Sequence, residues 1–404
     1  MDFLFYISII IFTGIIAAKV FSRFRLPNVT GYLIGGLIIG PSLLGIIPQE
    51  AMGDLKIISE MALAFIAYGI GSEFNLNQLK KMGKNIVTIT LFQTFATMVL
   101  VTLAIALISG QSPSFSLVLG AISAATAPAA TVMVIKQYRA KGEVVDTLLP
   151  VVALDDAICI IAFGIATSVA RAFVGQTGAI SFYNMLVIPS IEVIAALALG
   201  LIMGIFLILL IKKIEGETEL MSLVIAIVLA TAAISLRFNL SSLLSCMMLG
   251  ATVVNVIPNF KKAFTIADRF TPALYVAFFT ASGAELNLSV LRTVGLIGLV
   301  YIVFRIIGKL AGTYVGARVS NAPEKVRKYL GFTLLPQAGV AIGLSMVVKS
   351  ILPPPYGDQV RTIVLAGTIV FELIGPVITK NALIKAGEIR LKDSVEVNEV
   401  TGAV

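Results

Sequence analysis

The chain has 404 residues, of which 58% are hydrophobic and 13% are charged, with a formal net charge of +8 and a mean hydropathy of +1.00. A soluble globular protein could not bury so much apolar side chain, so the composition excludes that class and indicates a protein that crosses a membrane many times. Histidine is absent from the sequence, so any response to pH must come mainly from carboxylates or lysines.

Apolar segments of about 20 residues, the length that crosses a bilayer as a helix, recur from Phe3 to Ile384. They predict an all-α polytopic membrane protein with about thirteen transmembrane helices. The first segment has no positively charged region before it, which favours a retained helix over a cleaved signal peptide. The expected helices span residues 3–22, 28–48, 54–73, 85–109, 112–137, 144–170, 185–211, 218–236, 239–257, 268–286, 292–317, 329–350 and 361–384.

Clusters of Lys and Arg follow every second predicted helix, from the first to the thirteenth, with Arg171 and Arg292 as minor exceptions. Such residues collect on the cytoplasmic side of a membrane. We therefore expect the N-terminus outside the cell, the C-terminus in the cytoplasm and a location in the cell inner (cytoplasmic) membrane. Residues 389–404 would form a short cytoplasmic tail.

A short motif occurs twice in the chain. Gly-Ser-Glu-Phe-Asn-Leu at 71–76 closes the third predicted helix, and Gly-Ala-Glu-Leu-Asn-Leu at 283–288 closes the tenth, so the step from Gly71 to Gly283 defines the offset of a repeat. An odd number of crossings lies between the copies, so they face opposite sides, as in transporters built from inverted repeats. The single transporter unit of residues 1–388 would then divide into repeat one (about 1–171), a linker helix (about 185–213) and repeat two (about 218–388).

Under this pairing the fifth predicted helix corresponds to the twelfth, and proline interrupts both in mid-span, at Pro128 and Pro336. Proline lacks an amide donor, so it leaves carbonyls and half-helix ends unpaired at membrane depth. Such groups are tolerated only inside protein or beside water. Two opposed broken helices would bring their dipole ends to a central ion site. An ordinary proline kink in each helix is the alternative.

Two adjacent carboxylates, Asp155 and Asp156, lie in the middle of the sixth predicted helix. A charged side chain near the bilayer centre costs about 2.5–3.5 kcal/mol on insertion scales, so the pair indicates an ion or proton pathway. A neutralised pair that only holds helices together is the alternative. Consecutive helical residues point about 100° apart, so one carboxylate can bind a hard monovalent cation while the other meets a basic partner. Thr126 is the candidate hydroxyl ligand, with Ser123 and Thr131 as further candidates.

Two basic residues one turn apart in the eleventh predicted helix, Arg305 and Lys309, could be that partner. A buried lysine gives up its proton more readily than arginine, so Lys309 suits a pair that breaks during transport and Arg305 suits a permanent ion pair. Lys309 could instead extend to the cytoplasmic interface. If protons and a cation compete for one alternately exposed site, that competition is sufficient for exchange.

The remaining intramembrane polar groups have no clear ligand pattern. Cys159 and Cys246 lack ligand-like spacing, so we expect packing rather than a disulfide or a metal site. Glu60 and Glu372 are expected to be structural or dimer-contact groups.

Taken together, these motifs resemble the bacterial monovalent cation:proton antiporter superfamily, in the branch of paired-aspartate sodium/proton antiporters that is related to the Kef-type potassium/proton antiporters. The resemblance covers nearly the full chain. It rests on Arg25-Leu26-Pro27, Gly31 to Gly36, Gly40-Pro41, Thr126-Ala127-Pro128, Leu154-Asp155-Asp156, Gly308 to Gly312 and Leu335 to Gly339.

The resemblance implies roles for individual residues. Asp156 would bind the ion and the proton, Asp155 would pair with Lys309, and Thr126 would complete the sodium site at the crossing helices. Gln337 lies where other branches carry charged residues. The family also implies a homodimer, interleaved core and dimerisation domains, an elevator movement and electrogenic exchange of more protons than cations.

We therefore expect an antiporter that exchanges a monovalent cation, foremost sodium, for protons, with no enzymatic activity, no cofactor and no nucleic-acid partner. A Kef-type potassium/proton antiporter and a sodium-coupled symporter of an organic anion are the alternatives. An intramembrane aspartyl protease would need its aspartates on separate helices, whereas here they are adjacent. A nonselective channel is a further alternative.

Overall fold

The computed structural model describes residues 3–24, 26–71, 76–173, 187–211, 213–214, 216–256, 261–288, 294–348, 352 and 355–389. Within these ranges the chain is helical and contains no strand. It divides into two compact units, each built from three separate stretches of sequence. The first unit comprises Met1–Ala17, Tyr32–Gly83 and Ser181–Leu286, and the second comprises Ala18–Gly31, Lys84–Ile180 and Asn287–Val404.

The first unit holds helices from both of the predicted repeats. Its helices are most of α1 (Phe3–Ser22) and α2 (Asn28–Ile39), a short 3-10 helix (Gln49–Ala51), α3 (Met52–Gly71), α8 (Ile188–Ile211), α9 (Glu217–Arg237), α10 (Ser242–Val256) and α11 (Lys261–Glu285).

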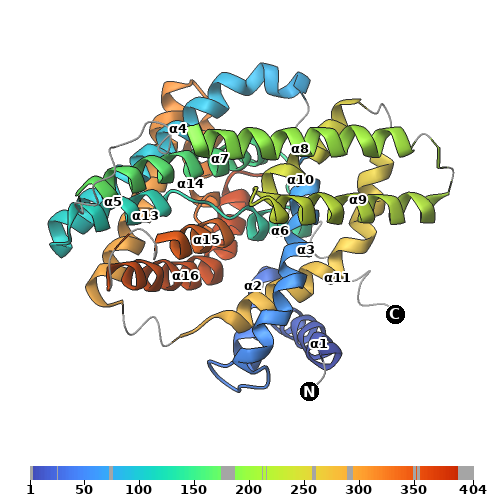
Figure 1. Cartoon of the computed structure of the whole chain (residues 1–404), viewed down its shortest axis with the longest axis horizontal. Coiled ribbons are helices and arrows are strands. Elements are labelled where there is room, and N and C mark those ends of the chain that lie inside the picture. The colour runs from blue at the N-terminus through green and yellow to red at the C-terminus, as the bar shows by residue number, and fades with distance from the viewer. Residues whose placement is uncertain are drawn as a thin grey trace. The chain divides into compact units, whose positions relative to one another are not determined.

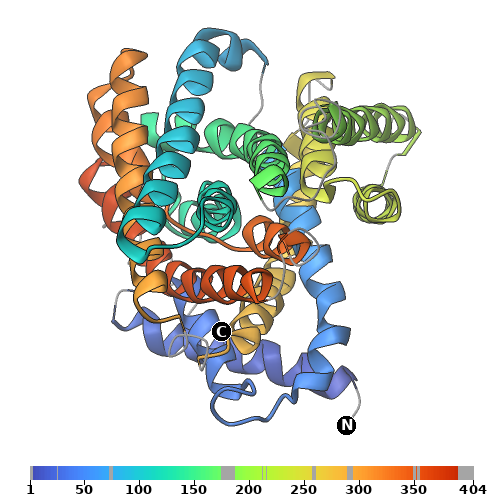
Figure 2. The same cartoon turned by 60° about the vertical axis from the view of Figure 1, so that its left-hand side comes forward.

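The second unit contains most of α4 (Leu76–Ser109), followed by α5 (Pro113–Ser123), α6 (Pro128–Tyr138), α7 (Glu143–Phe173), α13 (Gly295–Val319), α14 (Glu324–Thr333), α15 (Gly339–Val348) and α16 (Tyr356–Lys385). Helices α15 and α16 lie side by side in both ribbon views (Figures 1 and 2). A buried apolar cluster that includes Phe115, Tyr301 and Phe371 forms the core of this second unit.

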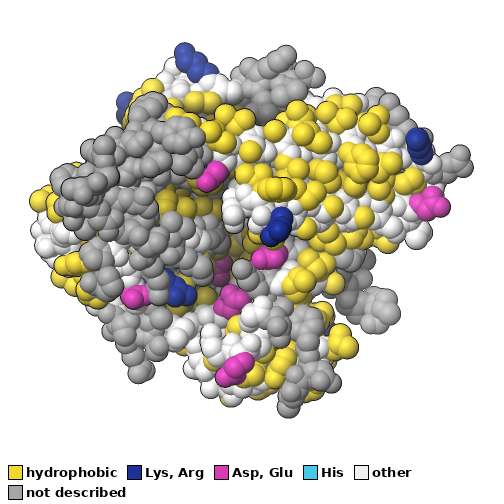
Figure 3. Space-filling view, in the orientation of Figure 1, with side chains coloured by type: hydrophobic (Ala, Val, Ile, Leu, Met, Phe, Trp, Pro, Cys, Tyr) yellow, Lys and Arg dark blue, Asp and Glu magenta, His cyan; other side chains and the backbone are white. Residues whose placement is uncertain are grey.

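The composition of the helices fits a membrane. Seven of those in the described part are long and apolar enough to cross one: α1, α4, α7, α8, α9, α13 and α16. Figure 3 shows hydrophobic side chains across the face that α8 and α9 present. On α8, Ile194 is 64% exposed and Ile202 is 62% exposed. Large apolar side chains are stable in such positions where lipid rather than water surrounds them.

Thirteen helical spans result when α5 is joined to α6 and α14 to α15 across their breaks, which agrees with the predicted number over the described residues. Several predicted ends were wrong. Helix α2 stops at Ile39 rather than 48, because Gly40-Pro41 cannot continue it. Helices α4 and α11 begin at Leu76 and Lys261, earlier than predicted, because their polar first turns were assigned to loops.

Glycine allows α3 and α10 to pack with their backbones in contact. A Cβ added at Gly71 would collide with the carbonyl oxygen of Met247, and one added at Gly250 would collide with that of Tyr68. Small residues of this kind permit the closest approach of membrane helices.

The same contact recurs between α2 and α11. A Cβ at Gly283 would collide with the carbonyl oxygen of Leu33, and one at Gly36 with that of Thr280. Gly283 takes the place of Gly71 in the repeated motif, and the other partners are related to their counterparts by the same or nearly the same offset. The two helix pairs therefore pack through equivalent positions, as two copies of one repeat would.

The two predicted breaks are confirmed in the second unit. Residues 124–127 separate α5 from α6, and residues 334–338 separate α14 from α15. The unwound stretches meet directly, because the backbone N–H of Ala127 donates to the carbonyl oxygen of Pro336 at 2.9 Å. Pro128 then begins α6 at its first position, where the missing amide hydrogen would have no partner in any case.

Candidate functional site

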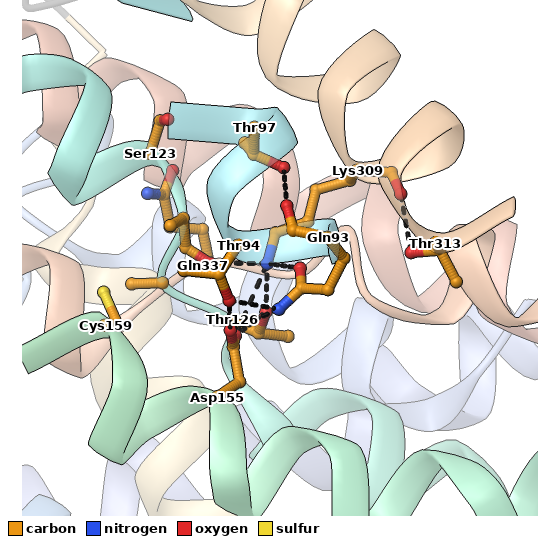
Figure 4. A network of polar contacts seen from close by, with 12 residues as sticks. Gln93, Thr94, Thr97, Ser123, Thr126, Asp155, Cys159, Lys309, Thr313 and Gln337 are labelled. Atoms are coloured by element: carbon orange, nitrogen blue, oxygen red, sulfur yellow. Dashed lines mark hydrogen bonds and ion pairs between the residues drawn. The ribbon is translucent and has the colours of Figure 1, made fainter. Parts of the chain in front are cut away.

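A network of buried polar side chains lies beside the first break (Figure 4). Asp155 comes from the middle of α7, Lys309 from α13, Gln93 and Thr94 from α4, and Thr126 from the unwound stretch between α5 and α6. All five belong to the second unit. Asp155 and Lys309 are both 0% exposed.

The carboxylate of Asp155 accepts hydrogen bonds from three uncharged side chains, in addition to the one from Lys309. Its Oδ2 accepts from the Thr126 hydroxyl at 2.6 Å. Its Oδ1 accepts from the Thr94 hydroxyl at 2.8 Å and also from Nε2 of Gln93. A buried carboxylate without such donors would be strongly destabilising, so these neighbours explain how the charge is tolerated.

Lys309 supplies the opposite charge. Its Nζ lies 3.4 Å from Oδ2 of Asp155. Nζ donates to Oε1 of Gln93 and to Oγ1 of Thr126, both at 2.6 Å, and to the carbonyl oxygen of Ala124 at 2.5 Å. That carbonyl is available because α5 has already ended at Ser123. The break in the helix thus creates one of the acceptors that hold the ammonium group.

Arg305 lies one turn earlier on α13, is 0% exposed and has different partners. Its Nε donates to the carbonyl oxygen of Ser123 at 2.9 Å, and its two terminal nitrogens donate to those of Leu335 and Ala125 at 2.6 and 2.8 Å. The guanidinium also lies 4.3 Å from the centre of the Phe371 ring. Arg305 therefore joins the two breaks. A permanent ion pair was predicted for Arg305, but its partners in the described part of the chain include no carboxylate at hydrogen-bond distance. Backbone carbonyls accept its hydrogen bonds instead.

Other predicted ligands lie apart from Asp155. The Ser123 hydroxyl donates to the Gly120 carbonyl oxygen of its own helix at 2.5 Å, and the Thr131 hydroxyl donates to the Thr333 carbonyl oxygen at 3.1 Å. Neither hydroxyl is therefore directed at the carboxylate.

Gln337 is also buried, beside Pro336 in the second break. Its Nε2 lies 2.8 Å from the Tyr301 hydroxyl and donates to the Ile122 carbonyl oxygen at 3.3 Å. The second break thus has an amide that bonds to a tyrosine hydroxyl, whereas Thr126 in the first break bonds to the Asp155 carboxylate.

Some predictions fall outside the described side chains. Asp156 lies in α7 next to Asp155, and Pro128 begins α6, but the side chains of both are outside the described part of the chain. Glu60 lies in α3 and Glu372, 7% exposed, in α16, so the two belong to different units.

The cysteines behave as packing residues. Cys159 and Cys246 are both buried, and the thiol of each lies 3.8 Å from a backbone carbonyl oxygen.

Gln93 and Thr94 were missed from the sequence because single uncharged polar residues are common in membrane helices. One signal could have found Gln93. The offset of the repeated motif aligns Phe92-Gln93 on α4 with Phe304-Arg305 on α13. The two equivalent polar side chains both bind beside the breaks, Gln93 at Lys309 and Arg305 at the carbonyls.

A second carboxylate holds the other end of α7. Glu388, 6% exposed, follows α16 and accepts hydrogen bonds from the first-turn backbone N–H groups of Val144 and Val145 at 2.7 and 3.0 Å. The Lys141 N–H donates to its carbonyl oxygen at 3.1 Å. Burial raises the pKa of Glu388, although the two N–H groups act in the opposite direction and Asp146 adds to the increase. Glu388 thus caps the helix that carries Asp155.

Two known sodium/proton antiporters are similar to this chain over 90% of its length. The High-affinity Na(+)/H(+) antiporter NhaS3 of Synechocystis sp. is 23% identical over 408 residues, which cover 90% of this chain and 86% of that protein. The Na(+)/H(+) antiporter 1 of Methanocaldococcus jannaschii is 24% identical over 391 residues, which cover 90% and 89%.

Solved structures show the same fold. The sodium proton antiporter MjNhaP1 from Methanocaldococcus jannaschii at pH 8 matches with a TM-score of 0.70 and 21% identity over 95% of this chain and 96% of that one. An electron-microscopy structure of the same antiporter gives 0.75 over 96% and 98%. The family model described as "Sodium/hydrogen exchanger, transmembrane" matches residues 7–385. The chain is therefore a multi-pass membrane protein that belongs to the sodium/hydrogen exchanger family of transporters.

Proposed function

We propose that the protein is a secondary active antiporter that exchanges sodium for protons by alternating access. The observation that carries this proposal is the fully buried Asp155–Lys309 pair beside the crossing breaks. A titratable pair at membrane depth has a functional explanation before a structural one. The family match and the printed names of the relatives support sodium and protons as the exchanged ions.

In this mechanism, protons and sodium compete for one site. Asp156 is the carboxylate that we expect to bind them in turn, with Thr126 as a second oxygen ligand. Asp155 and Lys309 form the pair that opens when the site changes its occupant. Oxygen ligands suit a hard cation. Because bound sodium displaces protons on one face and protons displace sodium on the other, the competition couples the two fluxes. A proton released by Lys309 would make the exchange electrogenic.

The arrangement in the cell is part of the same proposal. We place the protein in the cell inner membrane as a homodimer, with the N-terminus outside and the C-terminus in the cytoplasm. Residues 1–388 would form the transporter, with repeats at about 1–171 and 218–388 joined by a linker helix. The two units would be the dimerisation and core parts, and the unit with the site would move as an elevator.

The test is dissipation of a pH gradient in sealed proteoliposomes by sodium, lithium or potassium, repeated with the membrane potential clamped. We expect sodium to dissipate the gradient, and Asp156→Asn to abolish the response. A potassium response without a sodium response would instead indicate the Kef type. Transport by Asp156→Asn at the wild-type rate, or a sodium flux that moves no protons, would overturn antiport at this site.

A further inference from the structure

We propose that Gln93 is a positioning residue that bridges Asp155 and Lys309 and holds the pair together. This inference rests on the proposed exchange. The two ends of one amide contact the two charges: Nε2 donates to Oδ1 of Asp155, and Oε1 accepts from Nζ of Lys309 at 2.6 Å. In this orientation each end of the amide meets the charge that it stabilises.

The ammonium group has three N–H donors. Its closest acceptors are Gln93, Thr126 and the carbonyl oxygen of Ala124, at 2.5–2.6 Å, whereas Asp155 is farther away at 3.4 Å. The two charges are therefore joined mainly through neutral groups. Thr126 makes one bridge because it donates to Asp155 and accepts from Lys309. Gln93 makes the other.

Three glycines on α13 allow Gln93 to reach this position. A Cβ at Gly312 would lie 2.8 Å from Cα of Gln93, and one at Gly308 would lie 2.6 Å from Cα of Thr97. A Cβ at Gly316 would lie 2.9 Å from Cα of Ile89. Helix α4 thus packs against a glycine face of α13. Because the backbones are so close, the Gln93 amide lies between helices rather than at a surface, and it is 0% exposed.

The charged groups around Gln93 define what the amide can do. From α7 it meets Asp155, and from α13 it meets Lys309. Arg305 is engaged by the carbonyls of the breaks. The amide stabilises the charged forms of both partners, so it favours the closed pair over one that has released a proton. Removing the amide should let the pair open at a higher proton concentration.

The experiment compares two Gln93 variants of similar size. Gln93→Met removes both hydrogen bonds, so the pH of half-maximal sodium/proton exchange should move toward acid by about one unit. Gln93→Glu places a further negative charge beside Lys309. Because this charge makes Lys309 hold its proton more firmly, the same midpoint should move toward alkaline pH. Thr90→Val is the matched control, because the buried Thr90 hydroxyl on the same helix donates to the Ile86 carbonyl oxygen in its own helix.

Opposite shifts support the inference, since a purely structural defect would lower the rate at every pH without such a pattern. Shifts in the same direction, or midpoints equal to that of Thr90→Val, overturn it. If Gln93→Met does not fold, the direction of the Gln93→Glu shift decides.

Melting curves separate the two proposals. The destabilisation caused by Gln93→Met should be smaller in a Lys309→Met background if the contact is real. Coupling in the melting curves without exchange by the wild-type protein would refute the exchange proposal and the pH role, and would leave only a structural contact. Exchange without coupling would refute the role of Gln93 alone.

Discussion

Two buried cations lie one turn apart on α13 and are held in different ways. Arg305 donates to three backbone carbonyls, from both breaks, and these acceptors cannot change their charge. Lys309 lies beside Asp155 and two neutral bridges. The rigid guanidinium fork suits fixed acceptors, whereas the ammonium group can lose its proton. Helix α13 therefore carries one cation with fixed partners, Arg305, and one cation, Lys309, whose ion pair can open when a proton is released.

The largest effect is expected from Arg305→Met, which removes the hydrogen bonds to the three carbonyls. Each carbonyl left without a donor costs about 1–3 kcal/mol, and three lose their donor. We expect several kcal/mol of destabilisation, measured as a large fall in melting temperature in detergent. Arg305→Lys should recover only part, because an ammonium group lacks the flat fork. The exposed Arg318 on the same helix provides the control, Arg318→Met, which should change little. Equal melting of Arg305→Met and Arg318→Met would contradict the distinction.

The next largest effect should come from separating the Asp155–Lys309 pair. Lys309→Met or Asp155→Asn alone leaves one buried partner without its counterpart, at a cost of about 3–5 kcal/mol. The double variant should melt at a higher temperature than either single variant, because neither charge remains. A double-mutant cycle in detergent measures this coupling. Strictly additive losses would mean that the two charges do not stabilise each other.

A smaller effect is expected at Thr126, which forms one neutral bridge. Thr126→Val keeps the shape but removes the hydroxyl, so the KM for sodium should rise by about tenfold if that oxygen also binds the ion. Thr126→Ser should restore most of the affinity. The matched control is Thr131→Val, because the Thr131 hydroxyl binds the Thr333 carbonyl oxygen instead. A KM raised equally by Thr126→Val and Thr131→Val would remove Thr126 from the site.

The smallest effect is expected at Glu388, a carboxylate outside the Asp155–Lys309 pair. It tests whether a group other than that pair makes the stability depend on pH. Its pKa is raised above the ordinary value of 4.5, so the folded protein binds this proton more tightly than the unfolded chain. The resulting stability is fully present below that ordinary value and is lost as pH rises through the raised pKa. The melting temperature of the wild type, relative to Glu388→Gln, should therefore fall as pH rises through this range. A difference that is constant with pH would mean that the pKa of Glu388 is the same in the folded and unfolded states, which would contradict the raised pKa.

The sequence predicted the site best where a residue is costly in a membrane. Asp155, Lys309 and the two prolines stand out because each violates the apolar pattern of a membrane helix. For Arg305 a carboxylate partner was expected, but its hydrogen-bond acceptors within the described part of the chain are backbone carbonyls. These carbonyls become available only when two distant segments unwind and meet.

Partners that lie across helices were beyond the sequence for a similar reason. Gln93 reaches Lys309 only because α4 rests on the glycines of α13, a contact between segments that lie far apart in the chain. Ser123 has the right residue type at the right break, but its hydroxyl turns back to its own helix. The helix ends were displaced where polar first turns extend a helix, as at Leu76 and Lys261.

Gln337 distinguishes the two breaks chemically although their backbones are alike. Each break unwinds a helix, and the two unwound stretches are joined by a hydrogen bond between their backbones. Among the described side chains, Thr126 in the first break bonds to the Asp155 carboxylate, whereas Gln337 in the second bonds to the Tyr301 hydroxyl. An amide carries no charge and does not titrate. Of these two polar groups, only Asp155 can therefore respond to protons, so the second break would contribute backbone dipoles rather than a second proton-binding group.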